Sequence, residues 1–271
     1  MGCISSRKCV VGDTKTQTQI NLERHYKDVA KVYEGAFFYE SGVYQEWTLK
    51  LLQEHLQLGD SPSSLRLADV GGGTGNYTEL LAVQLRDPVL CVDMSEQMLK
   101  VAAERKGVIT KCQDAVTFAL SSDVITYDRI LLKEVIHHIP ATEMAAMYAG
   151  LRKQLASGGR IVTITRPQEV DYPLFTAARE VWRKNQHSAK QIANAIGASG
   201  LDVKCMEAVY IATMPKQNWF DMVRSRFWST FSAFSDKELE EGIAELAAKY
   251  ADVDTVQFDD RLIILIGTKT S

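Results

Sequence analysis

A glycine-rich turn between an apolar strand and a helix constrains this sequence more than any other feature. Residues 67–76 read LADVGGGTGN, with Gly71, Gly73 and Gly75 at alternate positions. Glycine is needed where the backbone takes a positive φ or where a ligand lies against it without an intervening Cβ. Asp69 stands two residues before the first glycine, and its carboxylate repels a pyrophosphate but attracts a ligand carrying an ammonium and a sulfonium. The spacing also differs from the G-x-G-x-x-G turn of dinucleotide-binding folds.

Short apolar runs alternate with longer amphipathic stretches through most of the chain. This alternation predicts a parallel sheet with helices on both faces. The expected strands are 65–70, 89–92, 108–112, 129–132, 160–165, 203–213 and 262–267. The expected helices are 76–85, 95–106, 141–156, 172–185 and 188–198, an aromatic helix over 219–231, and a helix after Ser235-x-x-Glu238, which is a capping-box pattern.

The chain of 271 residues is long enough for one α/β domain that buries roughly 70–75% of its unfolded surface, with no metal or disulfide needed for stability. We expect a flexible tail over 1–21 and a single domain over 22–271. Within that domain, 22–59 is a helical lid, 65–166 the cofactor-binding core, and 167–271 the substrate-side helices and the last two strands.

Two further acids follow predicted strands. Asp93 ends the second strand, 22 residues after Gly71, and Asp114 followed by Ala115 comes after the third. An acid at the end of the second strand binds ribose hydroxyls in dinucleotide folds as well, so Asp93 alone does not separate the two kinds of cofactor. The alternative for Asp69, Asp93 and Asp114 is a capping or turn role, which Asp often fills.

Taken in order, these motifs resemble those of the class I S-adenosylmethionine-dependent methyltransferases, of the type 11/12-like, small-molecule kind. The resemblance continues through 127–132 and 155–160. It implies a Rossmann-like, doubly wound, seven-stranded and mostly parallel sheet, with an N-terminal helical lid and a helical insertion before the last strand. It also implies that Asp69 and the glycine turn hold the methionine part of S-adenosylmethionine, that Asp93 binds the ribose, and that Asp114 and Ala115 contact the adenine.

Residues 132–140, LKEVIHHIP, follow the fourth predicted strand. They resemble the L-K-x-x-x-H segment of plant small-molecule O-methyltransferases, and the resemblance implies that His137 is a general base. A neutral imidazole can take a proton from a hydroxyl or ammonium nucleophile. The alternative is that His137 and His138 pack or cap a helix.

Aromatic residues gather in two other places. The N-terminal stretch resembles the helix that covers the cofactor in ubiquinone-type methyltransferases, and Tyr33 is the expected contact, because aromatic faces attract a sulfonium. The helix over 219–231, with Trp219 and Trp228, could form an apolar acceptor pocket. For both stretches the alternative is that the rings pack in the core.

The chain begins MGCISS, which matches the M-G-x-x-x-[ST] pattern for myristoylation of Gly2. One myristoyl chain binds a membrane only weakly, so we expect Cys3 to carry a palmitoyl group as the second signal. The alternative is a polar tail. Because the segment lacks the apolar stretch of a secretory signal, we expect a cytoplasmic protein with peripheral attachment to the cytosolic face of a membrane.

The sequence therefore predicts methyl transfer from S-adenosylmethionine to a small molecule by in-line displacement, without a metal. A net charge of −3, and LKEV where amide and base methylases have N-P-P-[YF], disfavour a nucleic-acid acceptor. Two other classes of function stay open. One is a catalytically inactive, lipid-anchored adaptor, and the other is a nicotinamide-dependent oxidoreductase, which the glycine spacing disfavours.

Overall fold

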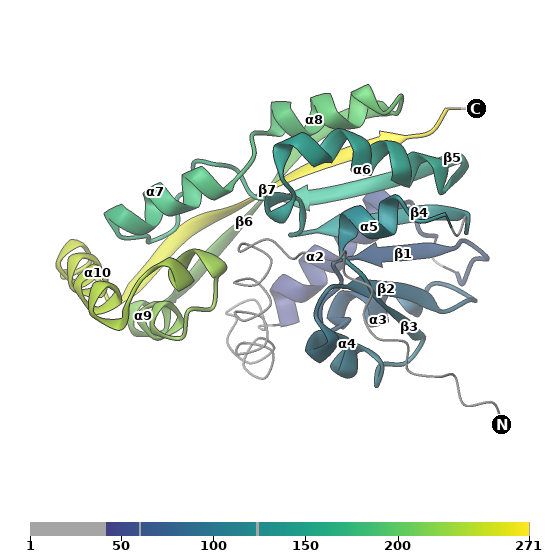
Figure 1. Cartoon of the computed structure of the whole chain (residues 1–271). Helices are drawn as coiled ribbons and strands as arrows, with labels where there is room; N and C mark the ends of the chain where they lie inside the picture. Colours follow the sequence, from purple (N-terminus) through teal and green to yellow (C-terminus); the bar gives the residue numbers. More distant parts are fainter. Residues whose placement is uncertain (1–41, 60, 123–124, 271) are drawn as a thin grey trace.

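Seven strands form one mixed sheet within residues 42–59, 61–122 and 125–270, which are the residues that the computed structural model describes. They lie in the order β3-β2-β1-β4-β5-β7-β6 (Figure 1). Their bounds are β1 (Leu67–Val70), β2 (Val89–Asp93), β3 (Val108–Cys112), β4 (Tyr127–Lys133), β5 (Leu155–Thr165), β6 (Asp202–Pro215) and β7 (Thr255–Thr268). β7 is antiparallel to β5 and β6, and the other neighbouring pairs are parallel.

Helices cover both faces of this sheet. Their bounds are α2 (Gly42–Leu56), α3 (Asn76–Ala82), α4 (Glu96–Ala102), α5 (Ala115–Ala119), α6 (Ala141–Lys153), α7 (Thr176–Asn185), α8 (Ala189–Ala198), α9 (Lys216–Arg224) and α10 (Asp236–Lys249), with short 3-10 helices η2 (Ile136–His138) and η3 (Ser229–Ala233). The predicted doubly wound α/β fold, with a helical insertion before the last strand, is confirmed. No helix in the described ranges is long and apolar enough to cross a membrane.

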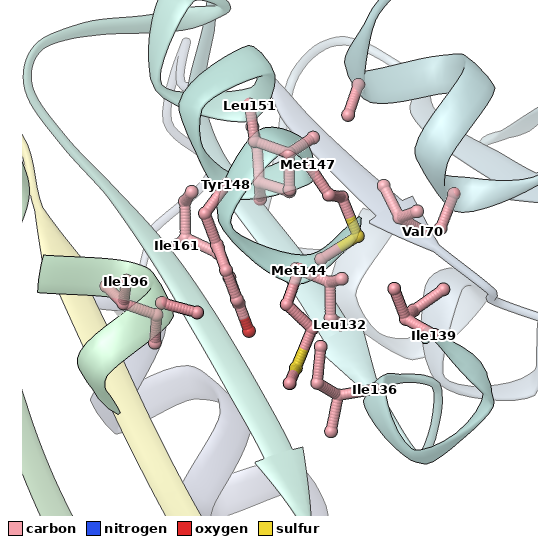
Figure 2. Close-up of a cluster of buried hydrophobic side chains, with 14 of the residues drawn as sticks. Val70, Leu132, Ile136, Ile139, Met144, Met147, Tyr148, Leu151, Ile161 and Ile196 are labelled. Carbon is pink, nitrogen blue, oxygen red and sulfur yellow. The ribbon is translucent and has the colours of Figure 1, made fainter. Parts of the chain in front are cut away.

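Alternate residues of each central strand point to opposite faces, and both faces are buried. On one face, Val70 and Leu132 lie in one buried cluster with Met147 of α6, and Ile196 of α8 lies beside Ile161 of β5 in the same cluster, as Figure 2 shows. On the other face, the buried side of α2 meets Leu81 of α3 and apolar residues of β1, β5 and β7.

The strand order reverses at β1, because β2 lies on one side of it and β4 on the other. In open α/β sheets, the crevice at the carboxyl ends of the strands on either side of such a reversal is where ligands bind. The loops after β1, β2 and β4 meet there. These loops contain the glycine turn and the segment with His137, and Asp93 is the last residue of β2.

β6 and β7 are each 14 residues long and extend well past the other strands (Figure 1). β5 pairs with β7 only over 263–268, so 255–262 pair with β6 alone. Helices α7, α9 and α10, with η3, pack on this extension and form a second core rich in aromatic rings. The predicted strands covered only part of this ribbon, because many of its residues are polar and exposed.

Several local predictions are corrected. The helices predicted over 76–85, 95–106 and 172–185 are the shorter α3, α4 and α7. The aromatic helix over 219–231 is two elements, since α9 ends at Arg224 and Arg226 takes a left-handed φ of 53° before η3. The helix predicted to reach 156 ends at Lys153, and β5 already begins at Leu155. The short helix α5, which follows β3, was not predicted. These errors all fall at helix ends or in a helix of five residues, where hydrophobic periodicity carries little information.

Several sequence predictions lie outside the described residues. These are the tail over 1–21 with Gly2 and Cys3, and the part of the lid that contains Tyr33. The described end of the predicted lid is α2, which packs on the sheet. Its Gln45 Nε2 donates to Asn76 Oδ1 at 3.0 Å, which places the beginning of α2 beside the glycine turn.

Candidate cofactor site

The glycine turn leaves β1 with three residues in the left-handed region. The φ angles of Gly71, Gly73 and Gly75 are 78°, 58° and 75°. A Cβ on Gly71 would lie 2.1 Å from Val135 Cγ2, and one on Gly75 would lie 3.0 Å from Ala102 Cβ. A Cβ on Gly73 would meet no atom within 4 Å among the described residues. Gly71 and Gly75 are therefore required by close packing as well as by φ, while the backbone at Gly73 is open to a ligand.

Asp69 lies at the carboxyl end of β1 with its side chain buried. Its Oδ2 accepts a hydrogen bond of 2.6 Å from Thr78 Oγ1. Burial raises the pKa of the Asp69 carboxyl to about 6, and the hydrogen bond from Thr78 and the charge of Lys133 offset only part of that increase. Among the described residues, Lys133 is the cation whose charge lowers this pKa. A cationic group nearby would favour its ionised form.

Asp93 ends β2 and connects two loops. Its Oδ1 accepts from the backbone N–H of Ser95 at 2.8 Å, and its Oδ2 accepts from that of Gly73 at 3.0 Å. Burial raises the pKa of Asp93, and these backbone hydrogen bonds oppose the increase. The carboxylate thus fixes the glycine turn of β1 against the end of β2. The backbone N–H of Met94 is a third donor to this carboxylate, and the lone pairs that these N–H groups leave are available to a ligand hydroxyl.

Asp114 caps α5. Its Oδ1 accepts from the backbone N–H groups of Val116 and Thr117 at 3.0 and 2.9 Å, and its Oδ2 accepts from Thr117 Oγ1 at 2.6 Å. The capping alternative from the sequence is therefore present in the structure. Ala115, the first residue of α5, is buried. The preceding residue, Gln113, carries a buried Oε1 with no hydrogen-bond partner in the described parts of the chain.

Sequence reasoning did not identify Arg105 as a residue of this site. Its Nε donates to the carbonyl oxygen of Thr74 at 2.6 Å, and its Nη1 donates to Glu79 Oε2 at 2.8 Å. Arg105 therefore links the glycine turn to the first turn of α3. The contact joins residues 31 apart in sequence, and no local pattern indicates it.

His137 lies in η2, after β4. Its Nδ1 is buried and has no hydrogen-bond partner among the residues described. Burial lowers the pKa of His137 to about 3, with smaller contributions from the charges of Arg166 and His187. The imidazole is therefore neutral at pH 7. The ring centroids of His137 and His138 lie 3.9 Å apart.

A buried ionic network, also missed by sequence reasoning, lies beside this segment. Arg166 follows β5 and donates from Nε and Nη2 to the two carboxylate oxygens of Asp260, at 3.0 and 3.2 Å. Its Nη1 lies 2.6 Å from Oε1 of Glu134. The hydroxyls of Tyr44 and Tyr172 both donate to Asp260. Burial raises the pKa of Asp260, but Arg166 and the two phenols outweigh it and hold this pKa below its ordinary value.

Trp219 and Trp228 lie in the aromatic core of the extension. Trp219 is fully buried, and its Nε1 donates to the carbonyl oxygen of Pro173 at 2.7 Å. Trp228 packs against the rings of Tyr172 and Trp182 at centroid distances of 4.8 and 5.0 Å. Both tryptophans therefore fill the core, which was the alternative to an acceptor pocket.

Comparison with known proteins finds a family match over the part of the chain that contains this site. Residues 67–159 match the family described as Methyltransferase domain. The chain is 26% identical over 174 residues to phosphoethanolamine N-methyltransferase 2 of Caenorhabditis elegans, an alignment that covers 60% of this chain but only 38% of that protein.

Solved structures show the same fold. The YcgJ protein of Bacillus subtilis covers 83% of this chain and 99% of its own, with a TM-score of 0.58 and 15% identity. A phosphoethanolamine N-methyltransferase 2 of Haemonchus contortus was crystallised with phosphomonomethylethanolamine and S-adenosylhomocysteine. It covers 95% of this chain and 61% of its own, with a TM-score of 0.58 and 17% identity.

Proposed function

We propose that this chain is a class I S-adenosylmethionine-dependent methyltransferase that transfers the methyl group of S-adenosylmethionine to a small-molecule acceptor, and its domain match and its fold support the proposal. The observation that carries the proposal is the glycine turn with Asp69 and Asp93. It lies inside the matched region, at the place where the strand order reverses. A nicotinamide cofactor fits less well, because its pyrophosphate would lie beside the buried carboxyl of Asp69.

The residues of the site suit S-adenosylmethionine in two respects. The buried carboxyl of Asp69 has a raised pKa, and a cationic methionine moiety would supply the positive charge that it lacks. The open face at Gly73 leaves room for a ligand against the backbone. In this proposal Asp69 and the glycine turn hold the methionine part, Asp93 accepts from the ribose hydroxyls, and Asp114 with Ala115 borders the adenine.

The bound cofactor supplies a methyl group that its sulfonium already activates. The main task of this chain is therefore to hold donor and nucleophile about 3–3.5 Å apart and in line. We assign His137 as the group that receives the proton of the nucleophile, since its imidazole is neutral and its Nδ1 lacks a partner in the described residues. A pKa of about 3 makes it a weak base, so it acts on an acceptor whose acidity rises as the methyl group is transferred.

The experiment that tests this function measures release of S-adenosylhomocysteine from S-adenosylmethionine with a panel of small amines, alcohols and thiols. Phosphoethanolamine belongs in the panel because two of the similar proteins are named for it. We expect at least one acceptor to raise the release above the rate without acceptor, and His137→Phe to lower that rate by roughly 100-fold or more. Cofactor binding without turnover on any acceptor would favour the adaptor instead.

We also propose myristoylation of Gly2, which rests on the M-G-x-x-x-[ST] pattern, and palmitoylation of Cys3 as the second signal that stable attachment needs. With both groups attached, the protein would meet its acceptor at the cytosolic face of a membrane. Expressed in eukaryotic cells with an alkynyl myristate, the wild type should be labelled and Gly2→Ala should not. Equal labelling of the two proteins, or no labelling of either, contradicts the proposal.

A further inference from the structure

Glu134 is the first residue after β4 and adopts a backbone conformation that side chains other than glycine rarely take. Its φ is 58°, in the left-handed region. Its N–H donates to the carbonyl oxygen of Ile164 at 2.8 Å, which continues the pairing of β4 with β5 by one residue. A long acidic residue in this conformation has no local sequence reason to be there, so a tertiary contact must hold it.

That contact is the ion pair with Arg166. Nη1 of Arg166 lies 2.6 Å from Glu134 Oε1, and the two side chains are 7% and 21% exposed. Arg166 cannot swing away to suit Glu134, because its Nε and Nη2 are bound to Asp260, which is fully buried in β7. The guanidinium therefore presents Nη1 in a fixed direction. Glu134 adjusts to Arg166, and its backbone follows.

The residue after Glu134 touches the cofactor turn. Val135 Cγ2 lies 2.1 Å from the point where a Cβ on Gly71 would stand, so the valine side chain packs directly on the Gly71 backbone. The backbone N–H of Gly71 is itself hydrogen-bonded to the carbonyl oxygen of Val92 in β2. Gly71 is thus held between the end of β2 and Val135. A rotation of the backbone at Glu134 would move Val135 off the glycine.

We infer that Glu134 is a positioning residue for the cofactor site. Through its ion pair with Arg166 it holds a left-handed backbone that keeps Val135 against Gly71, and so keeps the glycine turn ready to receive the cofactor. This inference rests on the proposed function, since it assigns the turn to S-adenosylmethionine. It needs no contact between Glu134 and the cofactor. The network around Arg166 and Asp260 is thereby coupled to cofactor affinity.

Two substitutions at this one position separate a backbone role from a carboxylate role. Glu134→Ala removes the ion pair but keeps a Cβ, so the left-handed conformation loses its support and becomes a minor population. Glu134→Gly also removes the ion pair, but glycine takes a positive φ without strain. Apparent affinity falls in proportion to the fraction of molecules in the competent conformation. By calorimetric titration with S-adenosylhomocysteine, we expect Glu134→Ala to bind about tenfold more weakly and Glu134→Gly to stay within about threefold of the wild type.

Glu143→Ala, an exposed carboxylate in the first turn of α6, is the matched control and should bind as the wild type does. Denaturant unfolding of each variant shows that it is folded during the titration. If the two Glu134 variants bind equally, whether both weakly or both like the wild type, the backbone role is wrong. If the wild type binds neither S-adenosylhomocysteine nor S-adenosylmethionine, the proposed function fails and this inference fails with it. If the wild type binds S-adenosylhomocysteine and the two Glu134 variants bind it equally, only this inference is overturned and the proposed function stands.

Discussion

Replacement of Asp93 by alanine should weaken binding of S-adenosylmethionine and S-adenosylhomocysteine by roughly 100-fold or more. The variant loses the proposed acceptor for the ribose hydroxyls, and hydrogen bonds to a charged group contribute about 1.5–3 kcal/mol each. Two such bonds at the lower figure correspond to about 100-fold in affinity. The variant also leaves the N–H groups of Gly73 and Ser95 without their acceptor, so the turn itself loosens. Calorimetric titration of purified wild type and variant measures the difference.

The matched control is Asp87→Ala, which removes an exposed carboxylate just before β2, at the opposite end of the strand from Asp93. It should bind the cofactor as the wild type does. Asp93→Asn keeps one oxygen acceptor without the charge. Its affinity for the cofactor should fall between those of the wild type and Asp93→Ala. Unchanged affinity in a folded Asp93→Ala protein would mean that the cofactor does not lie at the end of β2. The glycine turn would then serve the fold alone.

The parts of the fold that sequence predicts well are those that local patterns encode. The central strands β1, β2, β4 and β5 were expected near their observed places, because a strand buried on both faces reads as a continuous apolar run. The first half of β7, which is partly polar, was not expected. The glycine turn was recognisable because left-handed backbone and close approach restrict those positions to glycine, as Gly71 and Gly75 show. Asp93 and Asp114 were recognisable because they follow apolar strands, whose carboxyl ends meet at one edge.

The parts that sequence did not predict depend on contacts between distant residues. Arg166 and Asp260 are 94 residues apart, and Tyr44 and Asp260 are 216 apart. In sequence, Asp260 is one acid among polar neighbours in a strand, and nothing distinguishes it from the exposed ones. Arg105 is similar, since its contact with Thr74 exists only once α4 has packed beside the turn. Hydrophobic periodicity indicates which face of an element is buried, but it does not pair charges across the fold.

The electrostatics of the two buried carboxyls also follow from tertiary structure. Asp69 and Asp260 are both buried aspartates on strands of the same sheet, yet their pKa values shift in opposite directions. Asp260 has a guanidinium and two phenols around it, whereas Asp69 has one hydroxyl and a more distant lysine. The structure surrounds the Asp260 carboxylate with enough positive charge and hydrogen-bond donors to offset its burial. It does not do so for the Asp69 carboxylate. This difference is what we expect of a structural ion pair and of a site that receives a cation, respectively.

Arg166→Met should destabilise the protein strongly, by about 3–5 kcal/mol in the free energy of unfolding. Removal of one partner from a buried ion pair leaves the other charge uncompensated in a medium that solvates it poorly. Asp260 is fully buried, and Arg166 provides the cation that accompanies it. Methionine nearly fills the space of the arginine stem, so the loss comes chiefly from the charge. Denaturant unfolding at pH 7 measures the change. The control is Arg183→Met, in an exposed ion pair on α7, which should change the free energy of unfolding little because solvent screens the pair.

The double variant Arg166→Met/Asp260→Leu separates an uncompensated charge from lost packing. If the charge is the cause, the double variant should be more stable than Arg166→Met alone, since no buried carboxylate remains at position 260.

The dependence of the wild type's stability on pH has a definite sign. The pKa of Asp260 in the folded protein is held below its ordinary value, so its contribution to stability is present above about pH 4 and is lost as the pH falls through the folded pKa. The wild type should therefore lose more stability than the double variant on acidification below about pH 4. A double variant less stable than the single, with an unchanged acid profile, would show that this network stabilises the fold by packing rather than by charge.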